Sequence, residues 1–92
     1  MSQFTVESGR AVNFTGTGNV TTSDCAMIGF YVNSTTAGTV VFRRGGSGGT
    51  VLGGTITPAI GFHPFPASVP GGLHVTVGGT IDATAFVVEG AA

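Results

Sequence analysis

Two dense apolar runs joined by a short polar segment constrain the fold of this chain more than any other feature. Both runs lie in Cys25–Arg44, whose sequence is CAMIGFYVNSTTAGTVVFRR. In the first run, one face of an extended chain would carry Ala26, Ile28, Phe30 and Val32. The second run is rich in β-branched and aromatic residues, and the polar segment NSTTAG has the composition of a turn. The pattern predicts a β-hairpin beside which the other strands lie.

Shorter strands are predicted on both sides of this hairpin. These strands are predicted where apolar and polar residues alternate, or where β-branched residues cluster, between turn residues such as glycine. They are residues 3–7, 11–15, 19–24, 50–52, 55–57, 73–77 and 80–89. In the last of these the apolar face changes phase between Ala85 and Phe86, which predicts a β-bulge. Turn signals recur about every ten residues, and no segment has the periodicity of an amphipathic helix.

The expected fold is therefore all-β, with no substantial helix. We expect one domain over residues 1–92: a small antiparallel β-sandwich of jelly-roll or Greek-key type with seven or eight short strands. Residues 1–24 would be either edge strands of this sandwich or an N-terminal arm.

The four prolines of the chain all lie in Pro58–Gly72, with the sequence PAIGFHPFPASVPGG. Proline removes a backbone donor and is excluded from helices and central strands, so an ordered, extended loop is expected here. That loop would display Phe62, His63 and Phe65, and it either caps one end of the sandwich or projects as a contact arm. Arg43 and Arg44 end the second apolar run, next to a glycine-rich turn, and they are the other candidate contact residues.

Composition favours a protein that associates with other chains. A domain of 92 residues folds with little stability to spare, and the single cysteine, Cys25, excludes a disulfide within the chain. Charged residues make up only 8% of the chain, which contains no lysine, so a basic surface for nucleic acid is not expected. We also expect no signal peptide and no membrane span, because no segment has the required apolar length.

The residues that could carry out chemistry are few and scattered. The two histidines, His63 and His74, have no neighbouring acid or nucleophile in the sequence, and the four acidic residues are isolated. No spacing typical of a metal site occurs, and the glycine-rich segment GGSGG lacks the Lys-Ser/Thr pair of a phosphate-binding loop. We expect a protein that is not an enzyme and that needs no cofactor.

The second part of the chain resembles a known class of proteins. The stretches that carry the likeness are GFYVNSTTAGTVVFRRGGSGGTVLGGTITPA, GFHPFP and GLHVTVGGTIDATAFVVEG, which together cover Gly29–Gly90. They are similar to small virion proteins of tailed bacteriophages, in particular the cement or decoration proteins of the capsid. Residues 1–24 lie outside the resemblance.

The resemblance implies a structural role on the outer surface of the virion. The expected partners are the major capsid protein and further copies of this chain, with a homotrimer favoured, and the candidate contact residues are Arg43, Arg44, Phe62, His63 and Phe65. Two alternatives remain open at this point. One is a tail, fibre or head–tail accessory protein, and the other is a small carbohydrate-binding β-sandwich, although the chain has no tryptophan and one tyrosine.

Overall fold

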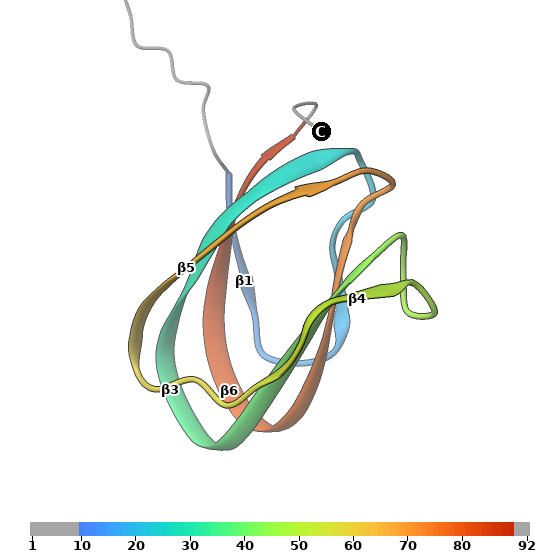
Figure 1. Ribbon diagram of the computed structural model, residues 1–92. Helices are drawn as coiled ribbons and strands as arrows, with labels where there is room; N and C mark the ends of the chain where they lie inside the picture. The colour runs from blue at the N-terminus through green and yellow to red at the C-terminus, as the bar shows by residue number, and fades with distance from the viewer. Residues whose placement is uncertain (1–9, 90–92) are drawn as a thin grey trace, which may run out of the picture.

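The computed structural model describes residues 10–89 (Figure 1). These residues form an antiparallel sheet and no helix, which confirms the all-β class. The six strands are β1 (Arg10–Phe14), β2 (Gly18–Thr21), β3 (Cys25–Arg44), β4 (Thr50–Ile56), β5 (Gly61–Val69) and β6 (Leu73–Glu89). The strand predicted at residues 3–7 lies outside the described residues.

The two long strands, β3 and β6, form the centre of the sheet. They pair along their whole length, from Cys25 opposite Glu89 to Arg44 opposite Leu73. Each has two short strands along its other edge: β1 and β2 pair with β6, while β5 and β4 pair with β3. The strand order is thus β1-β6-β3-β5 in one half of the sheet and β2-β6-β3-β4 in the other. We call these the first half and the second half.

The sheet bends between its halves, so that they face each other. Phe30 lies in the part of β3 that belongs to the first half and Phe42 in the part that belongs to the second, twelve residues later. A straight strand would separate them by about 40 Å, yet their ring centroids are 5.2 Å apart. Figure 1 shows β3 and β6 curving together at the lower end of the view. The core lies between the two halves.

The predicted hairpin at the polar segment was wrong. Both apolar runs belong to the single strand β3 and pair with β6 rather than with each other. β3 has 20 residues against 17 in β6, and its extra residues lie at three register shifts, two of which fall in or beside the polar segment. The segment forms the bend as a series of bulges. Residues 10–89 accordingly contain six strands, because β3 is continuous, residues 50–56 form one strand, and the segments predicted at 73–77 and 80–89 are both part of β6.

The bulge predicted in residues 80–89 was also misplaced. In β6 the residues Ile81, Ala83, Ala85 and Val87 are all buried on one face, without a change of phase. The bulge near this part of β6 lies instead in its partner strand β3, between Met27 and Gly29. It turns the side chain of Ile28 out of the core, where it is 45% exposed, and so corrects the prediction that Ile28 and Phe30 share a face.

The proline-rich segment is a strand rather than the predicted loop. β5 pairs with β3 alone and is therefore an edge strand, where a residue that lacks a backbone N–H is tolerated. Its side chains alternate: Phe62, Pro64 and Pro66 are exposed, whereas His63 and Phe65 are half-buried on the core side.

The buried hydrophobic residues form one continuous core. Its members come from all strands except β4, which contributes partly buried side chains, and they are Phe14, Val20, Cys25, Met27, Phe30, Val32, Val40, Phe42, Val69, Leu73, Val75, Ile81, Ala83, Ala85 and Val87. Phe42 is central, with the rings of Phe14, Phe30 and Phe65 at 6.3, 5.2 and 5.4 Å. The three rings belong to the first half and Phe42 belongs to the second, so these contacts hold the two halves of the bent sheet together.

Candidate functional site

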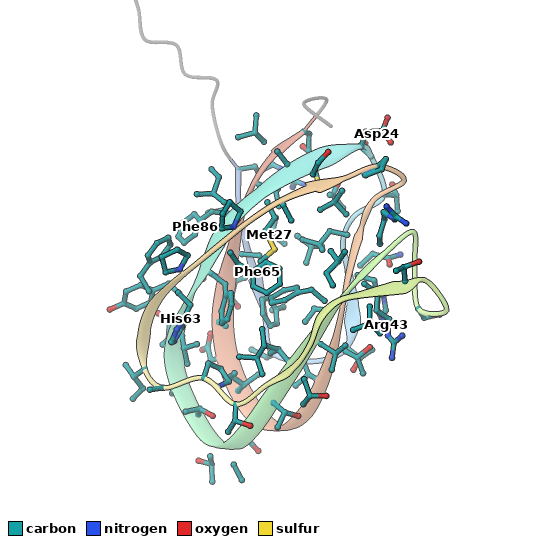
Figure 2. All side chains as sticks on the ribbon, in the orientation of Figure 1. Asp24, Met27, Arg43, His63, Phe65 and Phe86 are labelled. Carbon is teal, nitrogen blue, oxygen red and sulfur yellow. The ribbon has the colours of Figure 1, made fainter. Side chains whose placement is uncertain are left out.

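The five candidate contact residues do not form one surface. Phe65 lies between the two halves, with its ring 5.4 Å from that of Phe42 (Figure 2). His63 stacks on the core residue Phe30 at 5.1 Å. Phe62 points the other way and is 48% exposed. Phe62 is therefore available for contact with another molecule, whereas Phe65 packs against the core.

His63 is held by local contacts rather than by a catalytic partner. Its Nε2 lies 2.7 Å from the carbonyl oxygen of Ala59, to which it donates as an N–H. This bond fixes the turn that leads into β5. Within residues 10–89, no group of His, Cys, Asp and Glu side chains has the geometry of a metal site.

The two arginines at the end of β3 differ in their surroundings. Arg43 is half-buried and donates from Nη1 to the carbonyl oxygen of Gly49 at 3.3 Å and from Nε to the hydroxyl of Thr76 at 3.4 Å. It thereby anchors the glycine-rich turn that precedes β4. Arg44 is exposed, and the part of the chain that the structure describes offers it no hydrogen-bond acceptor.

The outer surface of the first half carries an aromatic cluster that the sequence did not reveal. Tyr31 on β3 lies opposite Phe62 on β5, and Tyr31 is 43% exposed. The ring of Phe62 is 6.0 Å from that of Phe86 on β6, and Phe86 lies on the outside of the sheet in Figure 2. We call Tyr31, Phe62 and Phe86 the outer aromatic cluster.

Gly29 makes room for this cluster. A Cβ atom at Gly29 would lie 2.9 Å from Cζ of Phe62 and 2.5 Å from the carbonyl oxygen of His63. The absence of a side chain therefore lets the ring of Phe62 lie over the strand towards Phe86. The signal for this arrangement was the position of Gly29 and Tyr31 in the same phase of β3, but only the register with β5 identifies their neighbour.

A polar network adjoins the outer aromatic cluster. The carboxylate of Asp82 accepts hydrogen bonds at one oxygen, Oδ1, from the side-chain amides of Asn13 at 2.8 Å and Asn33 at 3.3 Å. The amide of Asn13 also lies 3.3 Å from the hydroxyl of Thr84 and 3.0 Å from the carbonyl oxygen of Ala83. These bonds fix the orientation of the carboxylate before any ligand arrives.

A second polar group joins the ends of β1, β2 and β6. Arg10 donates two hydrogen bonds of 3.0 Å to the carboxylate of Glu89, and the hydroxyl of Thr21 donates to the same carboxylate. These hydrogen bonds lower the pKa of Glu89 from its usual value of 4.5, and the bond from Thr21 has a larger effect than the bonds from Arg10. The group is a structural clasp between strands far apart in the sequence.

Cys25 and His74 are both buried. Burial raises the pKa of the Cys25 thiol, and the carboxylates of Glu89 and Asp24 add to this effect, so the thiol is a poor nucleophile. His74 is 5% exposed and donates from Nδ1 to the side-chain oxygen of Asn19 at 3.0 Å. Its Nε2 finds no partner among residues 10–89.

Comparison of the chain with protein-family models, with curated proteins and with solved structures finds no match. Within the described residues, no helix is long and apolar enough to cross a membrane. Two accessible features of residues 10–89 can contact another molecule: the exposed Arg44 beside its glycine-rich turn, and the outer aromatic cluster with its polar network.

Proposed function

We propose that this chain is a non-enzymatic structural protein of a tailed-phage virion, a cement or decoration protein that binds the outer surface of the capsid. The resemblance of Gly29–Gly90 to such proteins motivates the proposal. The observation that carries it is the pairing order of the strands, because that order is typical of an architecture common in virion proteins.

The bend of the sheet supports that architecture. If β3 and β6 are each divided at the bend, the six strands become eight segments, numbered along the chain as β1, β2, the two parts of β3, β4, β5 and the two parts of β6. In that numbering the order of segments is 1-8-3-6 in the first half and 2-7-4-5 in the second half. A jelly roll has this strand order, which supports that architecture for the chain. The facing halves and the core between them further support a β-sandwich of this type.

Attachment to the capsid through the end of the second half follows from the accessibility of its residues. Arg44 is exposed, the adjoining turn consists of Gly45, Gly46, Ser47, Gly48 and Gly49, and Val51 on β4 is 41% exposed. A cation beside a small-residue turn and an exposed valine can meet an acidic, partly apolar surface closely. Arg43 supports this end by anchoring the turn.

The composition suits a protein that gains stability by assembly. Charged residues are 8% of the chain, and the single ion pair among residues 10–89 is that of Arg10 with Glu89. Binding to a capsid lattice, or to further copies as in the homotrimer we favour, would stabilise the folded chain by mass action. A surface with so few charges loses little hydration when a partner covers it.

The experiment that tests this proposal is the copy number of the chain relative to the major capsid protein, measured by quantitative mass spectrometry of purified virions. A number of copies comparable to that of the capsid protein is expected. A few copies per virion would instead indicate a tail, fibre or head–tail protein, and absence from virions would refute the proposal.

The attachment surface has its own test. Replacing Arg44 with Glu should lower occupancy on capsids at least about tenfold, because the charge that faces the lattice is reversed. Thr36→Glu, at the exposed bend, is the matched control and should leave occupancy unchanged. Equal occupancy for wild type and Arg44→Glu would remove this end of the molecule from the interface.

A further inference from the structure

We propose that the outer surface of the first half binds a neutral saccharide. One row of side chains crosses all four strands there, because Asn13 lies opposite Thr84, Thr84 opposite Tyr31, and Tyr31 opposite Phe62. Their neighbours along each strand, among them Phe30, Val32, Ala83 and Ala85, face the core. The row therefore points outward, with polar groups at one end and aromatic rings at the other.

The aromatic part offers ring faces for stacking. Tyr31 and Phe62 are adjacent across β3 and β5 and are 43% and 48% exposed. The edge of Phe62 is supported by Phe86 at 6.0 Å and by the bare backbone at Gly29, so its ring is held in place. The C–H face of a sugar ring is apolar and packs on exposed aromatic faces of this kind.

The polar part offers an oriented hydrogen-bond acceptor. Asp82 is two residues from Thr84 on the same face of β6, which places it diagonally from Tyr31, beside the bulge of β3 between Val32 and Ser34. Its Oδ1 is occupied by Asn13 and Asn33, while no described residue donates to its Oδ2. A sugar hydroxyl can donate to this oxygen while the ring of the same sugar, or of the next one, stacks on Tyr31.

The same polar groups argue against a purely apolar partner. An apolar surface that covered the cluster would also cover the Asp82 carboxylate, and burying a charged group without new donors is costly. Saccharides supply many donors, so the carboxylate keeps its hydrogen bonds when it is covered. An anionic ligand is disfavoured as well, because the arginine of β1, Arg10, is paired with Glu89.

The chain carries a built-in reporter for this site. Tyr31 is its only tyrosine and it has no tryptophan, so intrinsic fluorescence excited near the tyrosine band reports on the proposed site alone. Titration with cellohexaose, xylohexaose, mannohexaose, maltohexaose and chitohexaose should give a saturable change with at least one of them. The inference fails if none of the five changes the signal.

Three variants distinguish stacking from apolar contact. Phe62→Leu keeps an apolar side chain but removes the ring, and Asp82→Asn removes the charge of the acceptor; each should weaken binding of the active oligosaccharide about tenfold or more. Val51→Ala, on the outer surface of the second half, is the matched control and should bind as the wild type does. Thermal unfolding of each variant checks that the fold is intact.

Light scattering after size-exclusion chromatography measures self-association, the alternative use of the outer aromatic cluster. Self-association that Phe62→Ala abolishes and Phe62→Leu preserves would assign the cluster to a contact between copies, and it would overturn the inference. Saccharide binding that Phe62→Leu and Asp82→Asn leave unchanged would also overturn it. Because Arg44→Glu should leave saccharide binding intact, failure of the capsid proposal and failure of this inference are separable.

Discussion

The bend of the sheet makes one contact that a straight strand could not make, and a double-mutant cycle measures it. The rings of Phe30 and Phe42 are 5.2 Å apart at an interplanar angle of 52°, although both residues belong to β3. We expect Phe30→Leu and Phe42→Leu each to cost up to about 1.5 kcal/mol of unfolding free energy, because leucine conserves most of the buried volume.

The informative quantity is the coupling between the two substitutions. Aromatic pairs at this separation contribute about 0.5–1.5 kcal/mol beyond their buried area, so the double variant should deviate from the sum of the single variants by that amount. Urea unfolding followed by circular dichroism gives the free energy of unfolding of the wild type, the two single variants and the double variant. Since a change in the urea dependence would signal an altered unfolded state, the slopes of the transitions must agree for the comparison to hold.

A control pair fixes the scale, and an explicit result would refute the reasoning. Phe62 lies on the outer surface, so Phe42→Leu and Phe62→Leu should add within about 0.3–0.5 kcal/mol. If Phe30→Leu and Phe42→Leu also add within that range, their rings do not touch in solution. The two halves of the sheet would then not face each other as described.

Two further predictions concern the clasp and the bend. Hydrogen bonds from Thr21 and Arg10 lower the folded-state pKa of Glu89 below its usual 4.5, so the clasp stabilises the protein above pH 4.5 and this contribution is lost as the pH falls through the folded-state pKa. Glu89→Gln should therefore flatten the decline in the urea midpoint between pH 6 and pH 3. An unchanged decline would show that other groups cause it. At the bend, a Cβ on Gly38 would lie 2.7 Å from the carbonyl oxygen of Thr80, so Gly38→Ala should lower the free energy of unfolding in urea by about 1–3 kcal/mol. A Cβ on Gly16 would meet nothing within 4 Å, so the control Gly16→Ala should stay within about 0.5 kcal/mol of wild type. Equal stabilities of the two variants would contradict the close packing at Gly38.

Period-two alternation was a sound guide to strands and a poor guide to their connections. It identified both parts of β3 and both parts of β6 and excluded helices, because alternation is a local property of the extended chain. It could not distinguish a hairpin turn from a bulged bend at NSTTAG. Both need residues that tolerate irregular backbone, and the choice between them was made by β6, a partner about forty residues later in the sequence.

The same limit explains the mixed outcome at the candidate site. Once Gly61–Val69 is a strand, alternation places Phe62 on the opposite face from His63 and Phe65, but the prolines had indicated a loop that displays all three. The outer aromatic cluster was hidden for another reason. Tyr31, Phe62 and Phe86 are brought together by strand registers between β3, β5 and β6, and registers depend on long-range pairing that composition does not encode.

The bend also explains how one small sheet can offer two unlike surfaces. Because the inner faces of both halves are used for the core, every exposed contact must come from an outer face or from the end of a strand. The first half presents rings beside a fixed carboxylate, and the second ends in Arg44 beside the glycine-rich turn. A chain held by the second half would leave the first accessible. We therefore expect capsid-bound protein to retain oligosaccharide binding, and loss of that binding on attachment would show that the two surfaces overlap.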